Sequence, residues 1–215
     1  MSARPVILLT GFEPFGGAAS NPSWDAVQRL EADWSGSAKL HAAKLPTSFV
    51  TSGERLGALI DLLKPDIVLC VGVAQGRAAV TPELVAINRI DARIPDDAGS
   101  QPRDAAVVPA GPDGLFATLP VKAMVAAMRT AGVPASLSYS AGTFVCNSTF
   151  YALMHMLTDS QTRGGFIHIP ATPAQTVNGD CPTMALDQIV VALKAALDVC
   201  LIDNAHANIE AGTIA

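Results

Sequence analysis

The sequence predicts an α/β fold, a single-domain α/β/α sandwich around a twisted, mixed and mostly parallel sheet. Short apolar runs typical of buried strands alternate along the chain with segments that have the period of amphipathic helices. Half of the 215 residues are hydrophobic, which is enough for a sizeable core. There is no internal repeat and no break in composition, so we expect one domain over residues 1–215.

Strands and helices alternate regularly in the first third of the chain. Asn21 and Pro22 predict a helix start, because asparagine is a good N-cap and proline fits the first helical position. The run from Ile67 to Gly72 is apolar throughout, as expected for a strand that helices cover on both faces. The elements predicted here are a strand at Pro5–Thr10, a helix from Pro22 to about Asp33, a strand at Leu40–Leu45, a helix at Phe49–Leu63 and a strand at Ile67–Gly72.

The rest of the chain continues this alternation around one irregular stretch. Glu83–Ala92 alternates apolar and polar residues, which predicts a half-exposed strand of the kind found in antiparallel pairs. Arg93–Pro120 contains five prolines and no clear period, so it is either a surface excursion or a functional segment. Residues 204–215 are expected to fray. The other predicted elements are helices at Val121–Ala131, Cys146–Thr158 and Thr183–Ile202 and strands at Ser136–Ser140 and Phe166–Ile169.

Charge and cysteine content exclude several classes of function. The net charge is −5 and the basic residues are scattered, which argues against a nucleic acid or an anionic membrane as partner. No apolar stretch is long enough to span a bilayer, and the chain is predicted to be cytoplasmic with four free thiols. Only 15% of the residues are charged, below the ~25% typical of soluble domains, so we expect a homo-oligomer that hides part of the surface.

Open α/β sheets bind ligands beyond the carboxyl ends of their strands, and several loops are expected there. The first, Gly11–Gly17, lacks both the G-x-G-x-x-G and the Gly-Lys-Ser/Thr patterns, and its two phenylalanines indicate an apolar ligand rather than a nucleotide. The cysteines and histidines have no metal-ligand spacing, so no metal and no other cofactor is expected. A serine nucleophile also lacks its usual G-x-S-x-G setting.

Cys146, His168 and Glu83 are the candidate catalytic residues at this edge of the sheet. Cys146 begins a predicted helix, where the helix dipole favours a thiolate, although a free cysteine is also common as a small buried residue. Of the four histidines, only His168 ends a predicted strand at this edge, where it could act as the base for the thiol. Glu83 follows Thr81-Pro82 near the same edge and could orient the imidazole.

Four segments of the chain resemble the type I pyroglutamyl peptidases, also called pyrrolidone-carboxylate peptidases. Their order and spacing agree along nearly the whole chain, and each is long enough to be specific. The segments are LTGFEPFGGAASNPSW at Leu9–Trp24, TPELVAINRIDARIPDDAGSQP at Thr81–Pro102, SAGTFVCNSTFYALMH at Ser140–His155 and GGFIHIP at Gly164–Pro170.

The resemblance implies a cysteine peptidase that removes an N-terminal pyroglutamyl (5-oxoproline) residue from peptides through a thioester. It places the family's catalytic triad on Glu83, Cys146 and His168, and Arg93 beside the active site. It also implies an α/β/α sandwich that assembles as a homotetramer, with a dimer as the other expectation. The residues implied for the apolar lactam pocket are Phe12, Phe15, Ile94, Phe144 and Val145.

Two departures from the family pattern and two other functions stay open at this point. Val73 and Gln75, and Ala171-Thr172 after the GGFIHIP segment, stand where other side chains are expected, so the ligand contacts there are uncertain. The first alternative is a thiol amidase of the same fold that acts on another small cyclic or N-acylated amide. The second is a non-catalytic lactam-binding protein, which the presence of all three candidate catalytic residues disfavours.

Overall fold

The chain folds around a five-stranded sheet with the strand order β2-β1-β3-β7-β4. The computed structural model describes residues 4–176, 181–202 and 204–212. β1, β2, β3 and β7 run parallel, whereas β4 pairs antiparallel with β7. The strands are β1 (Val6–Phe12), β2 (Lys39–Leu45), β3 (Ile67–Val73), β4 (Thr81–Pro82) and β7 (Arg163–Ile169). The predicted mixed, mostly parallel sheet is therefore confirmed.

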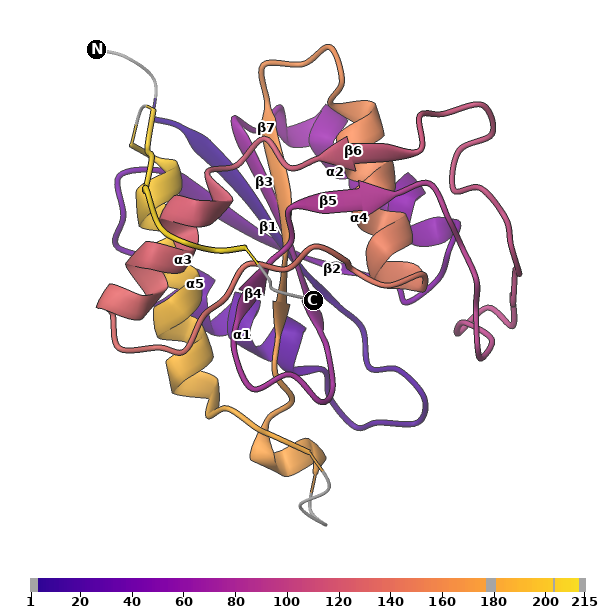
Figure 1. Ribbon diagram of the computed structural model, residues 1–215, viewed down its shortest axis with the longest axis horizontal. Helices are drawn as coiled ribbons and strands as arrows, with labels where there is room; N and C mark the ends of the chain where they lie inside the picture. The colour runs from indigo at the N-terminus through magenta and orange to yellow at the C-terminus, as the bar shows by residue number, and fades with distance from the viewer. Residues whose placement is uncertain (1–3, 177–180, 203, 213–215) are drawn as a thin grey trace.

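Helices cover both faces of this sheet, as the predicted sandwich requires. α1 and α3 pack on α5 at one face, and α2 packs on α4 at the other. Figure 1 shows α3 and α5 together on one side of the strands and α2 and α4 on the opposite side. The helices are α1 (Pro22–Ala32), α2 (Thr51–Leu63), α3 (Val121–Thr130), α4 (Val145–Met156) and α5 (Leu186–Cys200), with a 3₁₀ turn, η1, at Pro173–Gln175.

Successive residues of each strand enter two separate cores. Along β3, Ile67 and Leu69 belong to the core under α1, α3 and α5, whereas Val68 and Cys70 belong to the core under α2 and α4. Phe166 on β7 joins the second core, and its neighbour Ile167 joins the first. This alternation explains why the strands read as continuous apolar runs, since both faces are buried. It also assigns His168, two residues after Phe166, to the α2/α4 face.

The predicted strand at Glu83–Ala92 is wrong as a single element. β5 (Val85–Ile87) pairs antiparallel with β6 (Gly114–Phe116) in a separate two-stranded sheet, and Ile90 bridges to Ala105. The chain leaves the main sheet after β4 because this second sheet packs on α4. The segment Arg93–Pro120, predicted to lack regular structure, supplies β6 as the partner strand.

The predicted parallel strand at Ser136–Ser140 is also wrong in part. Ala135, just before the predicted strand, forms an isolated parallel bridge with Val80, and Ser138 forms another with Glu83. Pro82 lies between those two positions and has no N–H to donate, which interrupts the ladder at this edge of the sheet.

The predicted helix starts at Pro22 and Val121 and the predicted end at Leu63 are confirmed, and the other helix ends differ from the predictions by one to three residues. α1 begins as predicted, since the Asn21 side chain accepts a hydrogen bond from the Ser23 N–H and Pro22 is the first helical residue. Within the tail, the described residues 204–212 form no helix or strand, yet Ile209 and Ala211 pack against the first core. The end of the predicted frayed tail, 213–215, lies outside the described residues.

Candidate active site

The four parallel strands end at one edge of the sheet, and three of them bring the candidate residues together there. β1 ends at Phe12, β3 at Val73 and β7 at Ile169. Residues of the β1–α1, β3–β4 and β7–η1 segments therefore lie close to this edge, which is where open α/β sheets bind ligands. Phe12, expected in the loop after the strand, is the last residue of β1 itself.

Cys146 is the second residue of α4, at the end of the helix that faces this edge. Gly142 precedes the helix with a φ of 78°, a left-handed conformation that favours glycine. The N-cap residue is Phe144, whose apolar side chain accepts no hydrogen bond from the first turn. The first amides of α4 are therefore available to another acceptor near the thiol.

The Cys146 thiol lies against β3 next to the β7 position that carries His168. A Cβ added to Gly72 would come within 2.9 Å of Cys146 Sγ, so the sulfur occupies the space that this glycine leaves open. Gly72 pairs directly with His168 in the parallel register of β3 and β7. Both positions face α2 and α4. The thiol, which packs against β3, and the imidazole, which is carried by the neighbouring strand β7, therefore lie on the same face of the sheet.

Glu83 binds the imidazole from the opposite side. Its Oε1 lies 2.7 Å from His168 Nδ1, and the side chains of both residues are almost completely buried. A carboxylate can only accept, so Nδ1 carries the proton and Nε2 is left as the acceptor. The three candidate catalytic residues thus come from three segments that are distant in sequence.

Arg77 is a fourth polar residue of this cluster, and our sequence analysis did not assign it a role. Its Nη1 lies 2.7 Å from the same Glu83 Oε1 and also donates to the Thr81 hydroxyl. Its Nη2 donates to the Ser140 carbonyl at 3.0 Å. A cation in the loop after β3, at the binding edge of the sheet, is the signal that could have identified it.

Burial and neighbouring charges set the protonation of the cluster. Burial of the Cys146 thiol raises its pKa to about 12, with the Glu83 charge adding to the shift, so the expectation that the helix dipole makes it ionise easily is wrong for the unliganded protein. Burial also lowers the pKa of His168 despite its bond to Glu83. Burial opposes the charge on Glu83, but His168, Ser138 and Arg77 together lower its pKa. The resting cluster is a neutral thiol, a neutral imidazole and a carboxylate.

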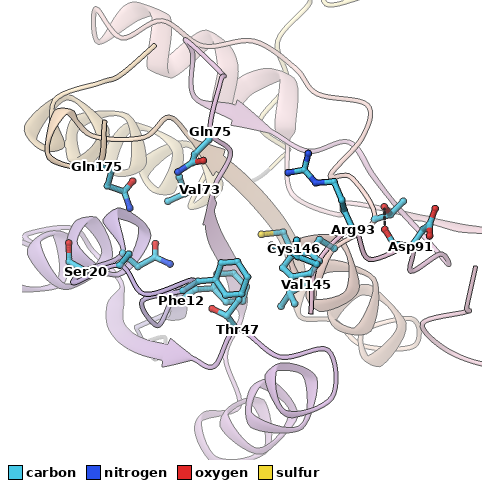
Figure 2. A pocket seen from close by; sticks show the side chains of 16 residues that line it. Phe12, Ser20, Thr47, Val73, Gln75, Asp91, Arg93, Val145, Cys146 and Gln175 are labelled. Carbon is cyan, nitrogen blue, oxygen red and sulfur yellow. Dashed lines mark hydrogen bonds between the residues drawn. The ribbon is translucent and has the colours of Figure 1, made fainter. Parts of the chain in front are cut away.

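A cavity of about 470 Å³ opens beside the thiol (Figure 2). The walls include Cys146 and all six predicted substrate-binding residues, which are Phe12, Phe15, Arg93, Ile94, Phe144 and Val145. Figure 2 shows Phe12 and Thr47 below the opening, Cys146 and Val145 at one side, and Arg93 above them. The structure therefore brings the residues of the first loop, the Arg93 segment and α4 around one cavity.

Aromatic rings form one wall of this cavity. The Phe144 ring lies 5.6 Å from the Phe15 ring, which also lines the cavity, and 5.1 Å from the buried Phe49 ring, which does not, in an edge-to-face arrangement. These distances are typical of favourable aromatic pairs. A flat, uncharged ring is the ligand that such a wall fits best, and a charged amine would lose its hydration against these rings.

Other segments contribute polar lining that our sequence analysis did not assign, namely Asn21, Thr47 and Gln175. Val73 and Gln75, the two departures from the expected pattern, also line the cavity. Asn21 uses its side chain to cap α1 and to donate to the Glu13 carbonyl, so its polar atoms are already engaged. The position of the segments after β2 and β7 at the binding edge was the available signal for Thr47 and Gln175.

The cysteines are unpaired, as expected from the sequence. Within the described ranges, no group of three histidine, cysteine, aspartate or glutamate side chains is arranged to hold a metal ion. In the same ranges, no helix has the length and apolarity needed to cross a membrane.

Comparison with known proteins gives consistent matches over most of the chain. The family model for pyroglutamyl peptidases matches residues 6–203. The chain is 53% identical over 196 residues to the pyrrolidone-carboxylate peptidase of Erwinia tasmaniensis, covering 91% of this chain and 92% of that protein. It is 49% identical over 212 residues to the corresponding protein of Cupriavidus necator, with 97% and 98% covered.

Solved structures of similar proteins have the same fold. The crystal structure of pyroglutamyl peptidase I from Bacillus amyloliquefaciens superposes with a TM-score of 0.89 at 45% identity, covering 93% of this chain and 97% of that one. A mutant pyrrolidone carboxyl peptidase from Pyrococcus furiosus gives a TM-score of 0.87 at 36% identity, with 91% and 98% covered.

Proposed function

The chain belongs to the pyroglutamyl peptidase family and is an enzyme of the cysteine-peptidase class, and we propose that it hydrolyses the amide bond after an N-terminal pyroglutamyl residue through Cys146, His168 and Glu83. The observation that carries this proposal is the cluster beside the cavity, in which a carboxylate binds a buried imidazole next to an unpaired thiol. The proposal assigns one catalytic domain to residues 1–215.

The first half of the reaction forms a thioester. His168 Nε2 takes the thiol proton as Cys146 Sγ attacks the pyroglutamyl carbonyl, so the neutral resting pair becomes a thiolate nucleophile only during attack. The uncapped amides at the start of α4 stabilise the oxyanion. The C–N bond then breaks, and the imidazolium gives its proton to the departing amine.

The second half regenerates the thiol. His168 Nε2 takes a proton from water, the hydroxide attacks the thioester carbonyl, and the C–S bond breaks. Pyroglutamate leaves, and the sulfur regains its proton from the imidazolium. Glu83 keeps the imidazole in the tautomer with Nε2 free and stabilises its charged form in both halves.

The cavity fits the pyroglutamyl group. Its lactam ring is flat and has no charged amine, which suits the aromatic wall formed with Phe15 and Phe144. An N-terminal glutamine, by contrast, would bring an ammonium group into this wall and lose hydration. Arg93, exposed at the cavity rim, adds positive charge near the reacting carbonyl.

We include two further points in the proposal. The enzyme acts in the cytoplasm, where its four unpaired cysteines stay reduced. It assembles as a homo-oligomer, a tetramer or a dimer, which accounts for exposed large apolar side chains such as Phe116 and Leu62. Light scattering on the purified protein measures this directly, and a mass of one chain would refute it.

Release of a chromogenic amine from pyroglutamyl, prolyl and glutaminyl derivatives tests the function. We expect turnover of the pyroglutamyl compound alone and a loss of roughly 10⁴-fold or more in kcat with Cys146→Ala. Equal turnover of the prolyl compound would favour the alternative thiol amidase. Binding of pyroglutamyl compounds without any turnover would favour the lactam-binding protein.

A further inference from the structure

We propose that Arg77 is a positioning residue for the reaction, which keeps Glu83 charged and oriented and connects it to the loop that leads into the helix of the nucleophile. The proposal rests on the proposed function for its kinetics, since Arg77 is taken to act through Glu83 and His168. It is carried by the three hydrogen bonds of the Arg77 guanidinium and by what each of them fixes.

Arg77 and His168 bind the same carboxylate oxygen. Nη1 of Arg77 and Nδ1 of His168 each lie 2.7 Å from Glu83 Oε1, and the Glu83 side chain is fully buried. Within the described part of the chain, Oε2 has no hydrogen-bond partner. These two contacts with Oε1 therefore help to orient the carboxylate, and Ser138 also stabilises its charge.

The positive charge of Arg77 also affects the pKa of His168, the proposed catalytic base. A buried carboxylate alone would favour a protonated imidazole, which cannot take a proton from the thiol. The guanidinium offsets part of the Glu83 charge, and it lowers the pKa of both Glu83 and His168. The arrangement therefore holds Glu83 as the anion and His168 as the neutral base at the same time.

The second arm of the guanidinium extends to the nucleophile loop. Nη2 donates to the Ser140 carbonyl, two residues before the Gly142 turn that leads into α4 and Cys146. Nη1 also donates to the Thr81 hydroxyl on β4. The Arg77 side chain is 28% exposed and does not line the cavity, so it has no contact with substrate to lose.

Two substitutions at Arg77 separate the effect of its charge from the effect of its hydrogen-bond geometry. Arg77→Met removes both, so we expect kcat to fall about tenfold to a hundredfold with KM little changed. The acid limb of kcat/KM should move to higher pH, because loss of a nearby cation raises the pKa of His168. Arg77→Lys keeps the charge but loses the planar guanidinium that donates in two directions. The acid limb of kcat/KM should therefore stay at the wild-type pH, while kcat remains reduced.

The charged and titratable groups that face His168 come from four segments. They are Glu83 after β4, Arg77 in the β3–β4 connection, Cys146 on α4 and, more remotely through Cys146, Cys70 on β3. Cys70 has a pKa of about 12 because of its burial and does not titrate in the range measured. The acid limb therefore reports on His168 and its two charged neighbours.

A second measurement does not depend on substrate. The rate at which iodoacetamide alkylates Cys146, followed by mass spectrometry of the peptide that contains it, should show the same shift in its acid limb. Removal of Arg77 leaves the buried Glu83 carboxylate with the neutral His168 and without a cation, which can prevent folding. The Glu83→Gln background avoids this problem, and Arg77→Met should have a smaller further effect there, because only the contact with Ser140 and the direct effect of the cation on His168 remain to be lost.

Arg89→Met is the matched control, since Arg89 pairs with Asp104 on the surface. It should leave the rates and the pH profile unchanged. A fall in Tm for Arg77→Met with the pH profile and kcat of the folded enzyme unchanged would show a structural role only and overturn the proposal. So would an equal Arg77→Met effect in the Glu83→Gln background. A wild-type enzyme without pyroglutamyl turnover would refute the proposed function instead, and the alkylation profiles would still test Arg77.

Discussion

The packing of single atoms around the sulfur decides whether the cluster can work. Cys146 Sγ and the Phe166 ring both lie against Gly72, since a Cβ added there would come within 2.9 Å of Sγ and of Phe166 Cζ. The His168 ring lies 4.9 Å from the Phe166 ring. The absent side chain of Gly72 is thus what lets the thiol, the phenyl ring and the imidazole lie together.

Gly72→Ala should therefore displace the thiol from the imidazole. We expect kcat to fall about a hundredfold, because a displacement of about 1 Å of a reacting group has that cost. Gly53→Ala on α2 is the control, since its Cβ would meet only the Ala152 Cβ at an ordinary 3.5 Å. Steady-state kinetics with circular dichroism to check folding measures both. An active Gly72→Ala enzyme would contradict the close approach of the sulfur to β3.

The roles of single residues could be predicted from the sequence only where their position in a strand or helix was sufficient to place them at the site. Cys146 and His168 could be placed at one edge because a helix start and a strand end both carry recognisable signals. The pKa of Cys146 could not be predicted, because burial outweighs the helix dipole and the burial of a residue is known only from the folded structure. The role of Arg77 was not predicted either, because a cation in a loop has no recognisable pattern of partners and one of its contacts, Ser140, lies 63 positions away.

At the scale of elements, the irregular segment after β5 forms a wall of the site. Asp96 fixes it, because its carboxylate accepts hydrogen bonds from the amides of Phe49, Ala98 and Ser100. The next residue, Asp97, donates its backbone N–H to the Thr47 carbonyl. These contacts join the segment that carries Arg93 and Ile94 to the start of α2.

Asp96→Ala should loosen this wall without changing the catalytic cluster. Hydrogen bonds to a charged group contribute about 1.5–3 kcal/mol each. We expect KM for a pyroglutamyl substrate to rise about tenfold, equivalent to about 1.4 kcal/mol, with a smaller change in kcat. Asp97→Ala is the matched control, because that side chain is exposed and the backbone contact remains. A larger effect from Asp97→Ala than from Asp96→Ala would contradict this account.

Elements were predictable where local patterns dominate and not where tertiary pairing does. The buried strands β1, β3 and β7 and the capped helix α1 follow from apolar runs and from the Asn21-Pro22 start. The Glu83–Ala92 pattern, in contrast, fits any half-exposed strand, and only the contact of β5 with β6 and α4 decides that it breaks there. The Ser136–Ser140 ladder fails because Pro82 is on the partner segment.

At the scale of the whole molecule, the fold places residues from both halves of the chain around one cavity. Phe12 and Thr47 come from the first half, and Cys146 and Gln175 from the second. The sheet order explains this, since β1 and β7 both lie next to β3 and end at the same edge. The topology could be predicted as a class from the alternation of strands and helices. The strand order could not, because pairing between distant strands leaves no local signal.

Trapping the reaction intermediate is the most direct test of the central claim, which is that the Cys146 sulfur carries the pyroglutamyl group. The wild-type enzyme is mixed with a pyroglutamyl substrate and quenched in acid within the first turnover, and its peptides are then analysed by mass spectrometry. We expect a mass increase of one pyroglutamyl group on the peptide that contains Cys146, and none in the Cys146→Ser variant. An adduct on any other residue, or full turnover by Cys146→Ser without an adduct, would contradict the account.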